Sequence, residues 1–159
     1  MVRLAPMRAQ EYAAWVEEAI ANYARERVRA GNTPEDEALE MARKTFDHIL
    51  PQGLETPSQH LYTIRNPDDE PVGVIWFGHG QPETGLPPTT GAIYDLVIYP
   101  AHRRRGYGRA AMLALEEEAR RFGLTALALH VFGHNTAARA LYEGIGYQIT
   151  NINMRKDLG

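Results

Sequence analysis

An apolar run followed by clustered arginines and two closely spaced glycines most constrains the fold of this chain. The run is Leu96–Tyr99, the arginines are Arg103–Arg105, and the glycines are Gly106 and Gly108. After the glycines, apolar residues recur at helical spacing, so a helix is predicted to begin here. The first N–H groups of a helix have no partners inside it and carry the positive end of its dipole. Glycines let a ligand approach the main chain closely, so this strand, turn and helix predict a phosphate-binding site.

Three other interpretations of this stretch compete with a phosphate site. Surface arginines are often merely solvated, but the chain has 17 Lys and Arg against 20 Asp and Glu, so the cluster, with Arg109 as its fourth member, is a real local concentration. Gly106–Ala111 fits the glycine pattern of a dinucleotide-binding fold. In that fold, however, the glycines follow the strand almost directly, whereas here six residues, Pro100–Arg105, lie between the strand and the glycines. A P-loop needs Lys-Ser or Lys-Thr after its glycine, and neither occurs here.

The composition is that of one globular domain spanning residues 1–159. The 44% hydrophobic and 23% charged residues are typical of soluble proteins. Because there is no cysteine, disulfides, thiolate zinc sites and cysteine nucleophiles are excluded. No apolar run reaches the roughly 20 residues that span a bilayer, and the start lacks the apolar core of a signal peptide, so we expect a cytoplasmic protein without membrane contact. The net charge of −3 argues against broad nucleic-acid binding.

The apolar spacing predicts an α/β (α+β) fold, a mixed twisted sheet flanked by helices. In the second helix, Thr33 is the expected N-cap and Pro34 the first helical residue. Asn66–Asp69 is the expected hairpin turn, and Gly80–Gly91 is expected to be a long exposed loop. The last strands are expected to be parallel, joined by crossover helices. The expected elements, in the order β-α-α-β-β-β-α-β-α-β, are strand Val2–Ala5, helix Ala9–Arg29, a helix from Pro34 to about Ile49, strands Gln59–Arg65, Val72–His79 and Ala92–Tyr99, helix Gly106–Phe122, strand Thr125–Phe132, helix Thr136–Glu143 and strand Tyr147–Met154.

Two motifs, in this order, resemble the GNAT superfamily of acyltransferases that use acetyl-coenzyme A. The first is a proline strand end followed by Arg-x-x-Gly-x-Gly within Ile98–Gly108. The second is Asn-x-x-Ala-x-x-Leu-Tyr closed by Gly-Tyr within Asn135–Tyr147. The resemblance is firm over Val72–Asp157 and only architectural before it. Arg104 stands where many relatives have glycine, a departure that should not block binding.

The resemblance implies that acetyl-coenzyme A lies between the strand ending at Tyr99 and the one ending at Phe132. In the family the first of these strands splays from its parallel neighbour. The main-chain groups of Val97 and Ile98 are then expected to be free, and the Ile98 N–H to polarise the thioester carbonyl. The pyrophosphate is expected on the amides from Arg104 to Arg109. The expected cofactor-binding residues are Val97, Ile98, Arg103, Arg104, Arg105, Gly106, Tyr107, Gly108, Arg109, Asn135, Ala138 and Tyr142.

The second motif places four residues on one face of a helix. Asn135, Ala138, Arg139 and Tyr142 are separated by three, four and seven positions, so this face is expected to line the cofactor arm. Asn135 either only caps the helix or also bonds the pantetheine. Tyr142 is either a packing residue or, as the resemblance implies, the acid that protonates the departing thiolate.

An amine must be neutral to attack, so a base or a water chain must take its proton. His130 stands where ribosomal-protein acetyltransferases of the family often carry a glutamate, and histidines ordinarily titrate near neutrality. Asp95, three residues before Ile98, is the alternative base, and either side chain could instead make only a structural hydrogen bond. His130 and His134 are four residues apart but stand at a strand end without HExxH or a third ligand, so we expect no metal.

These features predict an enzyme that moves an acetyl or related acyl group from acetyl-coenzyme A to an amine by direct attack in a ternary complex. Residues 72–157 are expected to bind the cofactor, while the helices within 7–50 and the Gly80–Gly91 loop form the acceptor side. The acceptor is a small molecule or a peptide. The alternatives are a coenzyme A binding sensor or partner module without turnover, and an RNA-binding arginine surface, which the acidic total disfavours. A homodimer stays open, since symmetric dimers are common.

Overall fold

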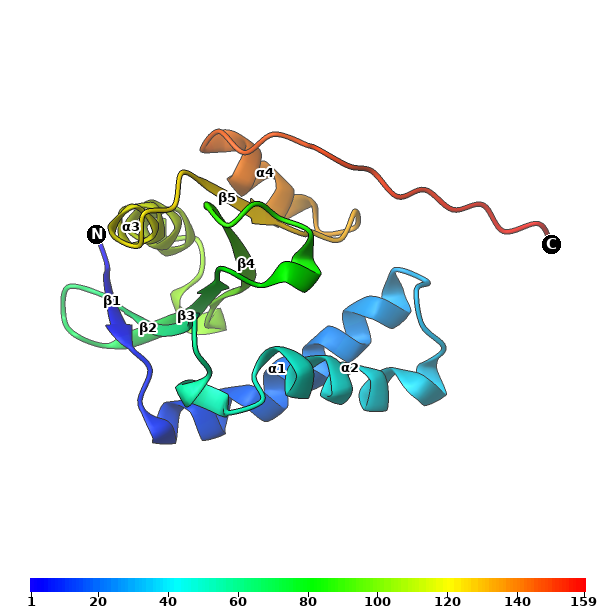
Figure 1. The fold of residues 1–159 in the computed structure, drawn as a ribbon, viewed down its shortest axis with the longest axis horizontal. Helices are drawn as coiled ribbons and strands as arrows, with labels where there is room; N and C mark the ends of the chain where they lie inside the picture. The colour runs from blue at the N-terminus through cyan, green and yellow to red at the C-terminus, as the bar shows by residue number, and fades with distance from the viewer.

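The structure is a computed structural model that describes residues 1–159 and forms one five-stranded sheet with helices on both faces (Figure 1). The order and bounds of the strands and helices confirm the expected mixed α+β fold up to and including the last helix. The strands are β1 Arg3–Pro6, β2 Gln59–Arg65, β3 Pro71–Gly78, β4 Thr90–Ile98 and β5 Ala126–Leu129, and the helices are α1 Ala9–Arg29, α2 Glu35–Ile49, α3 Tyr107–Arg121 and α4 Thr136–Gly144.

The strands lie across the sheet in chain order, and alternating side chains supply two cores. β1 to β4 are antiparallel, while β5 runs parallel to β4 after the chain crosses over through α3. On one face, Val74 and Trp76 pack against α1 and α2. On the other face, Ile75 and Phe77 pack against α3. Figure 1 shows α1 and α2 together on one side of the sheet and α3 on the opposite side.

Glu11, in the first turn of α1, fixes this helix to β2. Its carboxylate accepts hydrogen bonds from the Thr63 hydroxyl at 2.9 Å, the Arg65 guanidinium at 2.7 Å and the Arg8 main-chain N–H at 2.8 Å. Burial alone would raise the pKa of Glu11, but these bonds and the Arg8 charge outweigh it and lower the pKa to about 2. One carboxylate therefore positions the start of α1 on the sheet.

A bulge in β4 turns two successive side chains toward the same face. Trp76 lies opposite Asp95, but the next residue, Phe77, lies opposite Ile93, so Tyr94 is the extra residue. Tyr94 stacks on Trp76 with ring centroids 4.7 Å apart. Tyr94 and Asp95 consequently both face α1 and α2, which a regular strand would not allow.

The sheet opens between β4 and β5. The two strands pair only from Thr90 to Ile93 on β4 and along Ala126–Leu129 on β5. Beyond Ile93, β4 continues to Ile98 with no neighbour on that edge. The strand expected to end at Phe132 therefore ends at Leu129, because a strand needs a hydrogen-bonding neighbour and β4 has diverged.

The expected last strand, Tyr147–Met154, is absent, and this prediction is wrong. The chain after α4 is extended but has no secondary structure, and every residue from Gln148 to the end is exposed. Apolar spacing indicates which side chains favour burial, but a strand also requires a partner for its main-chain groups. The path of this segment leads away from β5, so the chain supplies no such partner (Figure 1).

Thr33 also differs from its expected role. Helix α2 begins at Glu35, with Pro34 at the N-cap position and no side-chain cap. The Thr33 side chain is buried, and its hydroxyl accepts a hydrogen bond from Arg27 Nε of α1 at 2.9 Å. The hydroxyl thus joins the two helices instead of capping the second.

None of the helices has the length and apolar character needed to cross a bilayer.

Candidate active site

The turn before α3 presents a row of unpaired main-chain N–H groups. Gly106 has φ +80° and Arg104 has φ +62°, both in the left-handed region that glycine adopts most readily. The first bond of the helix runs from Ala110 N–H to the Gly106 carbonyl at 3.1 Å. The N–H groups from Arg104 to Arg109 have no main-chain acceptor, so they are free for a ligand.

The arginines around this turn leave positive charge exposed. Arg103 donates from Nε to the Ile98 carbonyl at 3.0 Å and so fixes the turn to the end of β4. Arg104, Arg105 and Arg109 are exposed, and none of them forms an ion pair within the chain. Guanidinium groups with no carboxylate partner, beside free N–H groups, make a site suited to a diphosphate.

The same turn lies beside the open edge of β4. A Cβ on Gly108 would stand 3.4 Å from Leu141 of α4 and 3.8 Å from Ile98 of β4. The first turn of α3 therefore fits between the end of β4 and α4 with little room for a side chain. This packing brings the free N–H groups to the place where β4 has lost its neighbour.

The direction of the main-chain groups separates Ile98 from Val97. The Tyr99 N–H donates to the Val72 carbonyl of β3 at 2.9 Å. Hydrogen-bonded pairs alternate along antiparallel strands, so Val97 also directs its main-chain N–H and carbonyl at β3. The strands are close here, since a Cβ on Gly73 of β3 would stand 2.1 Å from the main-chain oxygen of Val97. The main-chain groups of Val97 therefore point at β3, and its role in cofactor binding stays a prediction, whereas the Ile98 N–H points to the open edge.

Asp95 is a partly buried carboxyl that faces α1. Its Oδ2 accepts a hydrogen bond from the Trp15 indole N–H at 3.3 Å. Burial raises the pKa of Asp95 to about 6, and the bonds from Trp15 and the Leu96 main-chain N–H only partly oppose this. A carboxyl that ionises near neutrality can accept a proton at physiological pH.

Tyr142, on α4, is partly buried near this carboxyl. Burial raises the pKa of its hydroxyl, and the negative charge of Asp95 raises it further. Its ring lies 6.0 Å from that of Tyr147, just after α4. The Tyr142 hydroxyl therefore keeps its proton at neutral pH and can act as a donor.

Asn135 occupies the expected N-cap of α4. Its Oδ1 accepts a hydrogen bond from the Ala138 N–H at 3.2 Å, and the residue is exposed. Arg139 pairs with Glu143 at 3.8 Å within the helix. The cap is confirmed, and the Asn135 side-chain NH₂ remains open to solvent.

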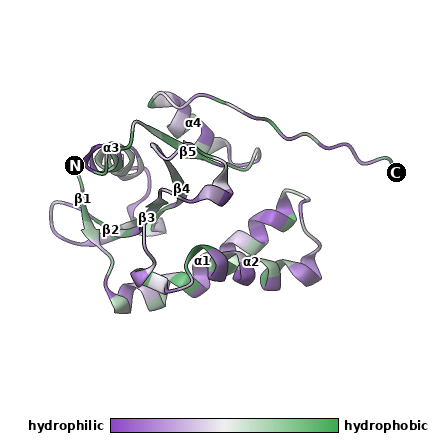
Figure 2. Cartoon of the chain, viewed as in Figure 1, coloured by the Kyte–Doolittle hydropathy of each residue, from purple (hydrophilic) through white to green (hydrophobic).

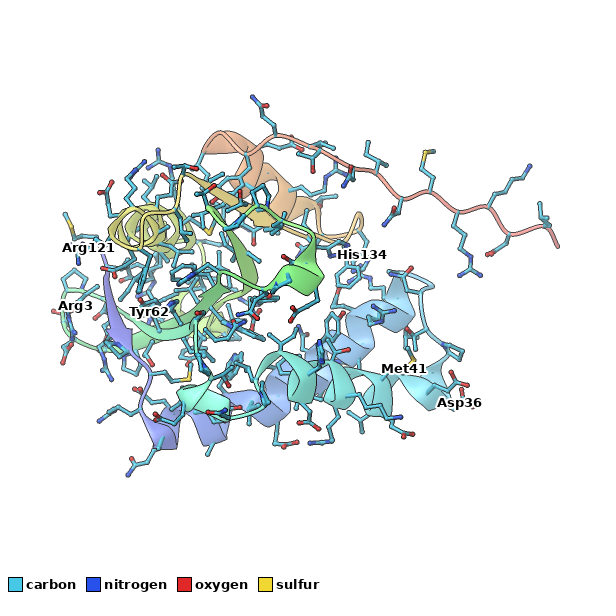
Figure 3. All side chains as sticks on the ribbon, viewed as in Figure 1. Arg3, Asp36, Met41, Tyr62, Arg121 and His134 are labelled. Carbon is cyan, nitrogen blue, oxygen red and sulfur yellow. The ribbon has the colours of Figure 1, made fainter.

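The two histidines after β5 lie in different surroundings. His130 is exposed, and its ring meets Phe132 edge-on with centroids 4.9 Å apart. His134 stacks on Phe132 and bonds through Nε2 to the Glu26 carboxylate of α1. Figure 3 shows His134 reaching toward α1 from the opposite layer. The His134–Glu26 pair joins α1 to the loop before α4.

A cleft of about 470 Å³ lies between α2 and the 80–91 loop. Tyr94, which the bulge turns toward α2, forms part of the wall of this cleft. The next residue in the chain is Asp95. His48 of α2 and Glu83 of the loop approach to 3.9 Å across it. The lining residues are Lys44, Thr45, His48, Ile49, Gln59, Glu83, Thr84 and Tyr94.

The sequence did not reveal Trp15 and Glu26 as site residues. Trp15 fits the apolar stripe of α1 and is indeed buried, and nothing local signals that its N–H reaches Asp95. Glu26 is one of many charges on α1, and its partner His134 is 108 positions away. Both contacts depend on how α1 packs on the sheet, which spacing along the chain does not encode.

The fold and this arrangement of groups define an acetyltransferase, and comparison with known proteins gives its family. The chain belongs to the acetyltransferase (GNAT) family, whose profile matches residues 23–147. It is an N-acetyltransferase of this family.

Two proteins of Bacillus subtilis (strain 168) are similar over nearly the whole chain. The uncharacterized N-acetyltransferase YycN is 38% identical over 157 residues, which is 99% of each chain. The uncharacterized N-acetyltransferase YdgE is 35% identical over 98% of this chain and 97% of its own. The crystal structure of the putative acetyltransferase YycN superposes with a TM-score of 0.92, at 35% identity and 99% coverage of each chain.

Proposed function

We propose that this enzyme transfers an acetyl group from acetyl-coenzyme A directly to an amine while both substrates are bound. The observation that carries the proposal is the row of free N–H groups from Arg104 to Arg109, beside the open edge of β4. These groups, with Arg105 and Arg109, suit the diphosphate of coenzyme A. When bound, acetyl-coenzyme A supplies an activated acyl group as a thioester. The Ile98 N–H would orient and polarise its carbonyl.

Asp95 is the better candidate for the general base. Its pKa, raised to about 6, lies near the operating pH, and Asp95 is close enough to Tyr142 to influence its ionisation. His130 is exposed and makes no hydrogen bond that fixes its ring. A base needs a defined position as well as a suitable pKa, and these two properties together favour Asp95, directly or through a water.

Tyr142 is proposed as the acid that returns a proton to the departing sulfur. Its raised pKa keeps the hydroxyl protonated at neutral pH. Its place on α4, one residue after Leu141 at the α3 turn, supports a position beside the thiol end of coenzyme A. Asn135, with its exposed NH₂, is proposed to bond the pantetheine arm in addition to capping α4.

The cleft between α2 and the 80–91 loop is proposed as the acceptor side. Tyr94 connects this cleft to Asp95, because the bulge directs both side chains to one face. An amine that enters from the cleft would thus approach the proposed base from the side opposite the coenzyme. The acceptor is an amine of a small molecule or a peptide.

Calorimetry followed by an acceptor panel tests this function. Coenzyme A should bind, and phosphate-free pantetheine should bind at least tenfold more weakly, because it lacks the diphosphate that the turn holds. Free thiol released from acetyl-coenzyme A should then rise with at least one amine. Equal binding of the two ligands would contradict the diphosphate site. Binding without thiol release on any amine would instead favour a coenzyme A binding module.

A further inference from the structure

Gln59, the first residue of β2, places a buried amide in the wall of the cleft between α2 and the 80–91 loop, called the acceptor cleft below. The residue is only 6% exposed. Its Oε1 accepts a hydrogen bond from the Trp76 indole N–H at 2.8 Å. Because an indole can only donate, this bond fixes which end of the amide is the oxygen, and the NH₂ group must point elsewhere.

The neighbours of Gln59 hold the amide in place and leave one donor open. A Cβ on Gly78 would stand 2.3 Å from the Gln59 oxygen, so the amide needs a glycine there. Burial raises the pKa of Tyr94, and a hydrogen bond from Gln59 partly opposes this, which accounts for one of the two N–H donors. Since Gln59 lines the acceptor cleft, the second N–H can meet a ligand. A donor of fixed direction selects for an oxygen, because leaving it unpaired costs free energy.

Lys44 brings a positive charge to the same cleft. Lys44 and His48 lie one turn apart on α2, and both line the acceptor cleft. Figure 2 shows hydrophilic positions interleaved with hydrophobic ones along this helix. His48 lies 3.9 Å from Glu83, which offsets its charge when the imidazole is protonated. Lys44 pairs with Glu40 at 3.1 Å, but both side chains are highly exposed and such a pair contributes little, so the ammonium can turn to an anion in the cleft.

The register of the sheet sets the separation between Gln59 and the proposed base. Trp76 of β3 lies directly opposite Asp95 of β4 on one side and Leu61 of β2 on the other. Gln59 stands two residues before Leu61. With strands about 4.8 Å apart and a rise of about 3.4 Å per residue, the Cα atoms of Gln59 and Asp95 are roughly 12 Å apart. A ligand that contacts both side chains therefore spans roughly 10 Å, the length of about three extended peptide residues.

We propose that the acceptor is a molecule of the size of a short peptide that carries a carboxylate as well as its amine, and that Gln59 and Lys44 bind this carboxylate. This proposal rests on the proposed function, because it takes the acceptor cleft as the entry of the amine. The Gln59 N–H donates to a carboxylate oxygen, and the Lys44 ammonium balances the charge. The amine at the other end then reaches Asp95. The cleft volume of about 470 Å³ is within the usual range for such ligands.

Glycine oligomers test the class of acceptor. Thiol release from acetyl-coenzyme A is measured with glycine, diglycine, triglycine and tetraglycine, and with the carboxamide of each. Triglycine should have a kcat/KM at least tenfold above that of glycine, which is too short, and of triglycinamide, which lacks the charge. Equal values for triglycine and triglycinamide would overturn the proposal, and so would thiol release with other amines but with none of the oligomers.

Two variants test the residues that bind the carboxylate. Lys44→Met removes the charge at an exposed position, so it should raise KM for triglycine about tenfold and leave that for triglycinamide within about twofold. Gln59→Glu keeps the shape and the bond from Trp76 but replaces the donor with an oxygen, so it should also raise KM for triglycine more than for triglycinamide. Arg43→Met is the matched control, because Arg43 precedes Lys44 on α2 but pairs with Glu17 of α1. Equal effects of Lys44→Met and Arg43→Met would remove Lys44 from the site.

Calorimetry separates this proposal from the proposed function. Triglycine and triglycinamide are titrated into the unmodified protein in the presence of coenzyme A. Binding of triglycine at least tenfold more tightly, with no thiol release in the assay, would support the carboxylate site and contradict acetyl transfer to this acceptor. Thiol release that is the same with and without a carboxylate would keep acetyl transfer and overturn the carboxylate site. Equal binding without any thiol release would contradict both.

Discussion

The indole N–H of Trp15 on α1 donates a hydrogen bond to the Asp95 carboxylate of β4 at 3.3 Å. This contact joins α1 to the strand that carries the proposed base. Asp95 faces α1 because it lies opposite Trp76 in the register with β3, and the bulge brings Tyr94 to the same face. The pKa of the base therefore depends on a residue of the helical layer.

Replacing Trp15 with Phe should move the pH dependence of the reaction. The bond from Trp15 favours the ionised form of Asp95, so without it the pKa should rise further above about 6. The acid limb of kcat/KM should shift to higher pH by up to one unit. Tyr12→Phe is the control, because Tyr12 packs on Trp15 at 5.9 Å without touching the carboxyl, and its profile should stay in place. An unchanged limb in Trp15→Phe would argue against Asp95 as the base.

Asp95→Asn should lower activity and raise stability above neutral pH. Loss of a general base is expected to reduce kcat by roughly 10² to 10⁴. Burial raises the folded pKa of Asp95 from 3.8 to about 6, so its ionisation opposes folding. This penalty is absent below pH 3.8 and complete above about pH 6, where it amounts to at most about 3 kcal/mol.

Urea denaturation at pH 4 and pH 8 checks the stability effect of Asp95→Asn. The gain over the unmodified protein should be small at pH 4 and largest at pH 8. Asp47→Asn, at an exposed position of α2, should give the same small change at both values. A variant that is less stable at pH 8 than at pH 4, relative to the parent, would show that burial is not the main influence on this carboxyl.

Tyr142→Phe should separate binding from turnover. The ring and its packing remain, so the dissociation constant of coenzyme A should stay within about twofold, while kcat should fall by roughly 10² or more because the proton donor is gone. Tyr147→Phe is a matched control, since its ring lies 6.0 Å away and it should retain turnover. Equal rates for Tyr142→Phe and the parent would remove Tyr142 from the chemistry.

Much of the secondary structure followed from the sequence because it depends on local patterns. Helix α1 and strand β2 have the predicted bounds, and the helix after the glycines begins one residue later than expected. The Asn135 cap was likewise evident from the residues beside it. These features are determined by residues that lie close to one another in the sequence.

The rest depends on which distant segments meet. Trp15 and Asp95 are 80 positions apart, and the bulge at Tyr94 arises from the register with β3, so neither could be read from spacing. The predicted strand Tyr147–Met154 had the apolar residues of a strand, but its pattern does not reveal whether another strand lies beside it. Val97 and Ile98 look alike in sequence and differ only in the direction of their main-chain groups.

Glu11→Gln should destabilise the protein in a pH-dependent way. The folded pKa of Glu11 is lowered from 4.5 to about 2, so its ionised form stabilises the fold above pH 4.5, and this contribution is lost as the pH falls toward 2. The substitution should cost roughly 2–3 kcal/mol at pH 7 and much less at pH 2.5. Thermal unfolding at the two pH values measures it.

Glu17→Gln is the control for this prediction. Glu17 pairs with Arg43 on the exposed side of α1, and the stability of the variant should match that of the parent at both pH values. If the two glutamine variants behaved alike, the buried bonds of Glu11 to Thr63 and Arg65 would not be what holds α1 on β2.

The most direct test of the diphosphate site is a titration of acetyl-coenzyme A into ¹⁵N-labelled protein, followed by amide NMR spectra. The N–H signals from Arg104 to Arg109 and of Ile98 should show the largest shifts, and their hydrogen exchange should slow, because each gains an acceptor. Shifts confined to other segments, with these amides still exchanging as in the free protein, would contradict the proposed mode of binding.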